Sequence, residues 1–339
     1  MDKNETLSQK VTDLTNVPIC NASFYLSNDI WRGASYNLVI VSEKNEQEET
    51  MAYQIFTDAT ADPNESMVQG LPDVQIIPME FAVGDKRFTY GSGDSISIHA
   101  FYSSLRDGEF AATSQINPNS YREAFEPWLQ NGIDVIYLCF SSGLSGTIQA
   151  ANMAMEELRE EYPDCKIICL DTLGASVGEG LLVCGALKKQ AEGLTFEDLC
   201  AWVLANRNKV CHWFTVDTFT HLKHGGRVSS TTAALGTVLN IKPLLHVDEE
   251  GTLKPVENHR GRVRAMQAQL EHLKAGWCPE IDKTIVVAHG DAPENAQLLK
   301  SMVSAAFPDA NVHTADIGPI IGAHSGPGTM LLVYWGNNR

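Results

Sequence analysis

The sequence predicts an α/β protein with two domains, each built on a largely parallel or mixed sheet flanked by helices. The chain has 339 residues, which is longer than a single domain of ordinary size. From residue 51 onward, short apolar runs alternate with amphipathic segments, a pattern typical of α/β folds. Residues 135–140 are continuously apolar, as expected for a parallel strand covered by helices on both faces.

The first domain, residues 51–193, is predicted to begin with a short strand at 53–57 that ends in a polar turn. Residues 74–83 and 86–90 predict a pair of strands around Gly84 and Asp85, a dipeptide typical of tight turns. The periodicity of the remaining segments predicts helices at 97–105 and 118–129, a strand at 135–140, a helix at 148–161, a strand at 166–171 and a helix at 177–190.

The second domain, residues 194–339, is predicted to start where Gly193 breaks the preceding helix. Thr195, followed three residues later by Asp198, resembles a capping box and restarts a helix. Ser229 or Ser230 is expected to cap a further helix that ends near residue 238. The other predicted elements are strands at 213–216, 243–247, 252–256, 284–288, 311–317 and 329–335, and helices at 261–274 and 293–307.

Residues 1–50 are predicted to form an N-terminal extension that is only partly structured, because they hold one convincing apolar segment, 36–41. Residues 1–14 lack the basic and apolar regions of a signal peptide, and no apolar run approaches the ~18 residues of a membrane span. The eight cysteines form no CxxC pair and several lie in apolar runs. We therefore expect free thiols and a cytoplasmic protein.

The charge of the chain excludes two classes of partner. With 42 acidic and 25 basic residues, the net charge is −17. A nucleic-acid-binding protein needs a basic face to neutralise phosphates, so we expect no nucleic-acid partner. An acidic surface is also repelled by anionic membranes, and no integral membrane association is expected.

The most informative stretch is SSGLSGT, residues 141–147, which follows the predicted strand at 135–140 and precedes a helix. Open α/β sheets bind ligands at this carboxyl edge, and glycines let the backbone approach a ligand closely. The unpaired N–H groups and positive dipole end of the following helix favour a small anion, either carboxylate or phosphate. The alternative is that Ser145 or Thr147 only caps the helix.

Other enzyme motifs find less support in these residues. No lysine follows the glycines of residues 141–147, as a Walker A motif requires. The GxSxG motif of serine hydrolases is not matched either, because Gly146 stands one residue too early after Ser145. A serine esterase or acyltransferase using Ser145 with His324 remains the second hypothesis. A third is a phosphate or nucleotide site in which Arg227, set after an adjacent glycine pair, grips the anion.

Several segments together resemble the DegV family of bacterial two-domain α/β proteins that bind a fatty acid. They are FTDATAD (56–62), TSQ (113–115), SSGLSGT (141–147), LKHGGR (222–227), GTVLNIKPLL (236–245) and GAHSGPG (322–328). The resemblance runs from about residue 52 to the C-terminus. Three positions depart from the family pattern: Ala59 replaces a serine, Ile116 a proline and His224 a lysine.

The resemblance implies a ligand site between the two domains, in which Thr113 and Ser145 hydrogen-bond the fatty-acid carboxylate. Ser142 and the N–H groups after Gly146 would lie close by, and Arg227 and His324 would lie near the carboxylate. It also implies that the chain is a carrier without a cofactor or metal and not an enzyme. A separate ATP-dependent fatty-acid kinase would phosphorylate the bound fatty acid to acyl-phosphate.

Overall fold

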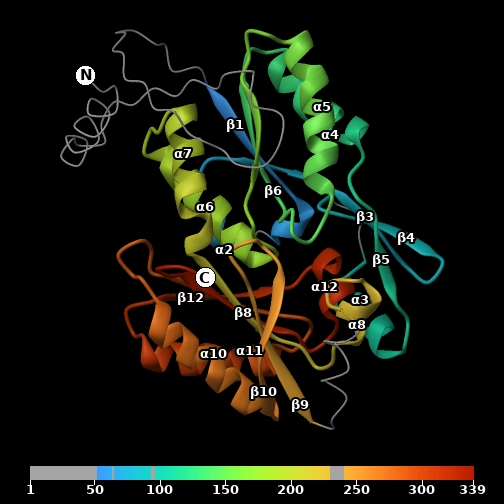
Figure 1. Cartoon of the computed structure of the whole chain (residues 1–339), viewed down its shortest axis with the longest axis vertical. Helices are drawn as coiled ribbons and strands as arrows, with labels where there is room; N and C mark the ends of the chain where they lie inside the picture. Colours follow the sequence, from blue (N-terminus) through green and yellow to red (C-terminus); the bar gives the residue numbers. More distant parts are fainter. Residues whose placement is uncertain (1–51, 63–64, 93–95, 230–239) are drawn as a thin grey trace, which may run out of the picture. The chain divides into compact units, whose positions relative to one another are not determined.

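Two main sheets with helices on both faces organise the part of the chain that the computed structural model describes, residues 52–62, 65–92, 96–229 and 240–339 (Figure 1). The predictions for residues 1–50 and for the helix ending near residue 238 lie outside these ranges. The chain thus has the predicted α/β fold with parallel and mixed sheets. The proposed domain boundary at residue 193 stays a prediction.

The first sheet is four-stranded, and all its strands are parallel in the order β2-β1-β6-β7. Its strands are β1 (Tyr53–Asp58), β2 (Val74–Ile77), β6 (Asp134–Cys139) and β7 (Ile167–Asp171). Strand β6 is buried along its whole length, as its continuous apolar sequence predicted. Helices α4 (Pro118–Leu129) and α5 (Thr147–Glu161) cover one face, and α6 (Val177–Ala191) and α7 (Phe196–Asn206) cover the other.

Local capping explains where these helices begin. The Asn117 side chain accepts a hydrogen bond from the Ser120 N–H at 3.0 Å, and Pro118 occupies the first turn of α4. The Thr195 hydroxyl accepts one from the Asp198 N–H at 3.2 Å, as the sequence predicted for the start of α7.

A small antiparallel sheet, in the order β4-β3-β5, lies beside the first sheet. It consists of β3 (Met79–Val83), β4 (Lys86–Tyr90) and β5 (Ala111–Thr113), and α3 (Ile98–Arg106) precedes β5. The prediction of one strand at 74–83 was wrong, because Pro78 separates β2 from β3 and the two join different sheets. Thr113 ends β5 and pairs with Phe81.

The second main sheet is six-stranded and mixed, in the order β10-β9-β8-β13-β11-β12. Its strands are β8 (Val210–Thr215), β9 (Ile241–Val247), β10 (Leu253–Arg260), β11 (Thr284–His289), β12 (Asn311–Asp316) and β13 (Met330–Trp335). Only β11 and β12 pair in parallel. Helices α10 (Arg262–Gly276) and α11 (Pro293–Ala306) cover the outer face of this sheet.

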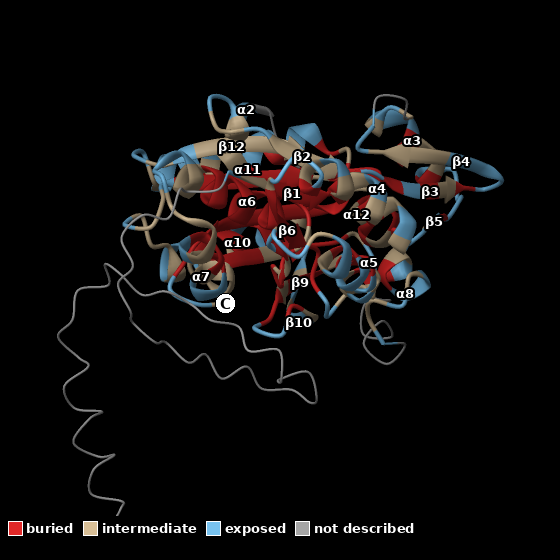
Figure 2. Ribbon diagram, turned by 90° about the horizontal axis from the view of Figure 1, so that it is seen from above, coloured by how far each residue is buried: buried red, intermediate tan, exposed pale blue. Residues whose placement is uncertain are grey.

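Helix α6 packs between the two main sheets. Residues 177–187 are all buried, and Figure 2 shows this helix in red at the centre of the molecule. One apolar core joins inner-face residues of both sheets to it, for example Ile136 from β6 and Val333 from β13. A side chain at Gly185 would overlap the ring of Trp202, so glycine permits the close approach of α6 to α7.

The short helices of the fold are η2 (Ala59–Ala61), α2 (Glu65–Val68), η3 (Arg207–Lys209), α8 (Thr220–His224) and α12 (Pro319–Ser325). Helix α8 carries His224 and helix α12 carries His324. All seven cysteines within the described ranges are free thiols. No helix in those ranges is long and apolar enough to cross a membrane.

Candidate functional site

A cavity of about 380 Å³ lies at the junction of the two halves of the fold, and its volume falls in the range of small-molecule sites. Residues from the six-stranded sheet, from the small sheet and from helices α8 and α12 line it, together with Phe140 after β6 and with Ala175 and Ser176 before α6. Most of its wall is apolar, and the larger apolar residues are Met79, Phe140, Leu144, Phe214, Leu222, Val247, Leu253, Ile317, Ile320, Ile321 and Leu331.

Four of the six residues predicted for the site line this cavity: Thr113, Ser145, Arg227 and His324. His224 lines it as well, and we call these five residues the polar cradle. The cradle gathers residues that are up to 211 positions apart in the sequence, as between Thr113 and His324. The remaining two predicted residues, Ser142 and Gly146, do not line the cavity.

His324 and Thr113 are in direct contact, with 2.9 Å between the His324 Nε2 and the Thr113 Oγ1. A side chain at Gly225 would place its Cβ 2.1 Å from the His324 Nδ1, so only glycine leaves room for the imidazole there. That Nδ1 is buried without a hydrogen-bond partner within the described part of the chain. Burial, with Arg227, His224 and His221 nearby, lowers the pKa of His324 to about 4.

Arg227 brings a positive charge to the cradle. Its guanidinium donates a hydrogen bond to the carbonyl of Gly225, and burial lowers its pKa. His224 stacks on Phe110 with 4.1 Å between the ring centroids. A partly buried guanidinium beside a neutral imidazole suits an incoming carboxylate, which would form charge-assisted hydrogen bonds.

Ser145 enters the cradle from the loop before α5. Its hydroxyl lies 2.8 Å from the Thr147 hydroxyl, and the Thr147 N–H donates to it at 3.3 Å. The helix itself begins after Gly146 without a side-chain cap. The loop is held against the β9–β10 turn, where the Ser141 hydroxyl donates to the carbonyl of Gly251 at 2.8 Å.

The structure places Ser142 and Gly146 elsewhere. Ser142 is exposed, and its N–H donates to an Asp171 carboxylate oxygen at 3.3 Å. Gly146 faces Gln115, whose Nε2 would lie 2.9 Å from a Cβ at that position. Gln115 lines the cavity, as do Phe214 and His212 on β8. No role was predicted for these three: Gln115 belongs to the TSQ segment but was not assigned to the site, and Phe214 and His212 are strand residues outside any motif.

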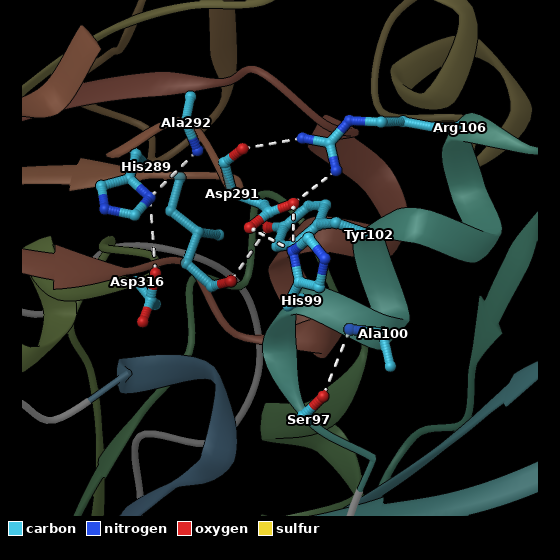
Figure 3. Close-up of polar contacts among 10 residues, drawn as sticks. Ser97, His99, Ala100, Tyr102, Arg106, His289, Asp291, Ala292 and Asp316 are labelled. Atoms are coloured by element: carbon cyan, nitrogen blue, oxygen red, sulfur yellow. Dashed lines mark hydrogen bonds and ion pairs between the residues drawn. The ribbon is translucent and has the colours of Figure 1, made fainter. Parts of the chain in front are cut away.

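Helix α12 positions His324, and the elements around it fix α12. Tyr102 of α3 donates from its hydroxyl to the Ile317 carbonyl at 2.9 Å, just before α12. A Cβ at Gly322 would lie 2.5 Å from that hydroxyl, so α12 sits directly on α3. Figure 3 shows how Arg106 and His99 of α3 both bond Asp291 in the loop before α11.

The FTDATAD segment also supports α12. The Asp62 carboxylate accepts hydrogen bonds from the Gly318 N–H at 3.0 Å and from the Ser176 hydroxyl at 2.6 Å. Gly318 is the N-cap of α12 and Ser176 that of α6, so one side chain ties the starts of both helices. Burial raises the pKa of Asp62 to about 7.

Two further buried carboxyls share Thr60 beside Asp62. The Thr60 Oγ1 lies 2.5 Å from Asp58 Oδ1 and 2.8 Å from Glu179 Oε2. One hydroxyl proton cannot serve both bonds, so one of these carboxyls holds a proton of its own. Burial raises the pKa of Glu179 well above its ordinary value, and nearby Asp58 raises it further. We call Asp58, Asp62 and Glu179 the acidic cluster.

The model of the DegV family, described as "Uncharacterised protein, DegV family", matches residues 52–336. The chain belongs to the DegV family. A DegV domain-containing protein of Clostridium perfringens is 38% identical to it over 85% of this chain and 98% of that protein. The predicted family is thereby confirmed, and the match begins where the N-terminal extension ends.

Solved structures of DegV proteins share the fold. A fatty-acid-binding DegV protein from Thermus thermophilus matches with a TM-score of 0.74 and 27% identity, over 84% of this chain and 100% of that one. The Fak B3 protein of the Streptococcus pneumoniae fatty acid kinase, loaded with linoleic acid, matches with a TM-score of 0.75 over 85% of this chain and 100% of its own. At 24% identity, the second likeness bears on the fold alone.

Proposed function

We propose that this protein binds a long-chain fatty acid, with the carboxylate in the polar cradle and the acyl tail in the apolar part of the cavity. The observation that carries the proposal is the convergence of Thr113, Ser145, Arg227 and His324 on one largely apolar cavity. The 27%-identical Thermus thermophilus protein, which binds fatty acid, supports the same ligand class.

The energetics of such a ligand suit this cavity. A carboxylate buried without partners costs several kcal/mol, which hydroxyls, a guanidinium and an imidazole offset. At about 0.8 kcal/mol per buried methylene, roughly 14 methylenes contribute about 11 kcal/mol before the costs of ordering and association. Since the net charge is −17, long-range steering does not attract the carboxylate, and the cradle supplies the attraction locally.

We further propose that the protein presents the bound fatty acid to a separate fatty-acid kinase, which makes the acyl-phosphate. Arg227 and His324 would lie beside the reacting carboxylate, while ATP and the transfer chemistry would belong to the kinase. An acidic carrier suits a partner with a basic docking face. This role rests on the family resemblance and on the place of the carboxylate within the cradle.

The esterase hypothesis gains no support from the cradle. A serine nucleophile needs a hydrogen bond to its general base. Here His324 Nε2 bonds Thr113, and the Ser145 hydroxyl bonds Thr147 instead.

Across the described residues, no three His, Cys, Asp or Glu side chains are grouped to hold a metal ion.

One preparation of the full chain tests both proposals. Ligand extracted from the purified protein should contain long-chain fatty acid by gas chromatography, and ligand-free protein should bind added palmitate. The loaded protein, mixed with a bacterial fatty-acid kinase and ATP, should then yield acyl-phosphate in a salt-sensitive reaction. Absence of any fatty-acid binding overturns the first proposal. Binding without transfer, or transfer insensitive to salt, counts against the presenting role or the charged interface.

A further inference from the structure

At one place in the cavity wall, two turns that belong to different sheets meet. One is the SSGLSGT loop, residues 141–147, which follows β6, and the other is the turn between β9 and β10. We call residues 247–253 the hairpin tip. Leu144 of the loop and Val247 and Leu253 of the tip line the cavity, so both sides of this contact form part of the wall around the ligand.

The two turns fit closely because both carry glycine. A Cβ at Gly143 would lie 2.7 Å from the carbonyl oxygen of Glu250 and 2.8 Å from that of Gly251. A Cβ at Gly251 would in turn lie 2.1 Å from the Ser141 Oγ. The Ser141 hydroxyl donates a hydrogen bond to the Gly251 carbonyl at 2.8 Å, and within the described residues this is the one hydrogen bond between tip and loop.

The hairpin tip is held together by its own hydrogen bonds. The Asp248 carboxylate accepts from the Thr252 N–H at 2.7 Å and from the Thr252 hydroxyl at 2.8 Å. The Asp248 N–H donates to the Thr252 carbonyl at 2.9 Å, and the Gly251 N–H donates to the Asp248 carbonyl at 3.0 Å. Because these bonds lie within the turn, they persist when it moves, and we expect the tip to move as one body.

The tip extends beyond the part of the hairpin that the sheet and α10 hold. Strand β9 pairs with β8 at three positions, which end at His246, and with β10 at seven. In β10, a bulge between Pro255 and Glu257 interrupts the ladder, and such a bulge bends a strand locally. Just past the bulge, Glu257 bonds His272 of α10 at 2.7 Å. The base of the hairpin is therefore fixed, and the tip lies on the far side of a bend.

One further hydrogen bond reaches the tip from the C-terminal segment, where the Arg339 guanidinium donates to the Asp248 carbonyl at 3.3 Å. In the described part of the chain, two hydrogen bonds and the apolar contacts of Val247 and Leu253 thus hold the tip closed. Since a single hydrogen bond contributes little net free energy, the tip can open locally without unfolding of the sheets.

We propose that the hairpin tip is the lid of the cavity, and that the fatty acid enters and leaves when the tip separates from the SSGLSGT loop. The inference rests on the proposed fatty-acid-binding function and adds the route by which the ligand reaches its site. Opening exposes the apolar side chains of Leu144, Val247 and Leu253 to the incoming acyl chain. Closure restores the bond between Ser141 and Gly251 and separates the ligand from water.

A disulfide across the contact tests this route. A Cβ at Gly143 would lie 2.8 Å from the Thr252 Cγ2, so Gly143→Cys combined with Thr252→Cys brings two thiols within reach of each other. Stopped-flow fluorescence then measures release of cis-parinaric acid, a fluorescent long-chain fatty acid, from the loaded full-length double variant. The oxidised form should release it at least about tenfold more slowly than the reduced form, and dithiothreitol should restore the rate.

The reduced double variant is the matched control, because it differs from the oxidised form by the disulfide alone. Wild-type protein treated with the same oxidant controls for the native thiols and should keep its release rate. Ser141→Ala is a second measurement that needs no disulfide. Loss of the hydrogen bond to Gly251 should raise the release rate about fivefold.

The outcomes separate the lid from the proposed function. Equal release rates of the oxidised and reduced double variant overturn the lid and leave fatty-acid binding standing. Should that variant fail to fold or to form the disulfide, an unchanged release rate in Ser141→Ala overturns the lid instead. Failure of wild-type protein to bind cis-parinaric acid or palmitate overturns the proposed function itself.

Discussion

The polar cradle, which is at most partly buried, and the acidic cluster, which is buried, are two polar regions of the fold that differ in how completely they are hydrogen-bonded. Burial favours the neutral form in both. It lowers the pKa of His324 to about 4 and raises that of Asp62 to about 7. The two pKa shifts thus run in opposite directions, and each favours the neutral side chain.

Their hydrogen bonds show the difference in role. No carboxylate oxygen of Asp58, Asp62 or Glu179 is buried without a partner, whereas His324 Nδ1 is, within the described residues. A fully satisfied polar network stabilises and fixes a fold, while an unsatisfied buried atom needs another explanation. The hydrogen bonding of the acidic cluster is thus that of a structural network, whereas the cradle lines the cavity and is where we propose that the ligand binds.

Asp62→Ala should have the largest effect on the free energy of unfolding. A small effect would contradict the structural role of the acidic cluster. The change leaves the Gly318 N–H and the Ser176 hydroxyl buried without their acceptor. We expect a loss of about 2–4 kcal/mol in the free energy of unfolding, measured by urea denaturation. Palmitate affinity should fall as well, because the start of α12 loses its support.

A surface variant is the control for Asp62→Ala. Glu271 pairs with Lys274 at 2.9 Å, and its side chain is 68% exposed. Glu271→Ala should change the free energy of unfolding by less than about 1 kcal/mol, because exposed ion pairs contribute little. Equal losses in the two variants would show that the acidic cluster is not a structural network.

The second prediction concerns the pH dependence of stability. His324 has a folded pKa of about 4 against an ordinary value of 6.5, so the unfolded chain binds more protons between these values. Its contribution to stability is complete above pH 6.5 and is lost as the pH falls through 4. Asp62 has the opposite sign, and its contribution is lost as the pH rises from 3.8 through about 7.

His324→Asn separates the two contributions. Relative to this variant, wild-type protein should lose up to about 3 kcal/mol of stability between pH 6.5 and pH 4, because folding lowers the pKa of His324 from 6.5 to about 4. Urea denaturation of both proteins at intervals of pH measures the difference. Curves that run parallel across this range would show that His324 is not held neutral by burial.

The fold was predictable from the sequence where periodicity was strong. The buried strand β6 and the Thr195 cap of α7 match their predictions, and the cavity gathers four of the six predicted site residues. These features depend on local pattern. Strand β5 was not predicted, because three residues of strand hold no periodicity, and only pairing with β3, as between Thr113 and Phe81, makes them a strand.

The remaining site residues depend on contacts between distant segments. His212 is one residue in an ordinary strand, and its close contact with Gly178 of α6 appears only in the folded chain. Likewise, Asp62 belongs to a segment that had suggested a polar turn, and its bond to Gly318 spans 256 positions. No spacing rule in one sequence predicts such a contact.

The smallest predicted effect is on palmitate affinity, and it tests whether Ser145 and Ser142 of the SSGLSGT loop differ in their contact with the ligand. Ser145 lines the cavity and Ser142 is exposed, although both were predicted to lie near the carboxylate. Thr113→Ala and Ser145→Ala should each weaken palmitate binding by about 1–3 kcal/mol, because the carboxylate loses a hydroxyl donor. Ser142→Ala should leave the affinity unchanged, and titration calorimetry measures all three. If Ser142→Ala weakened binding as much as Ser145→Ala, the carboxylate would lie outside the cradle. The contrast between the cradle as a ligand site and the acidic cluster as a structural network would then fail.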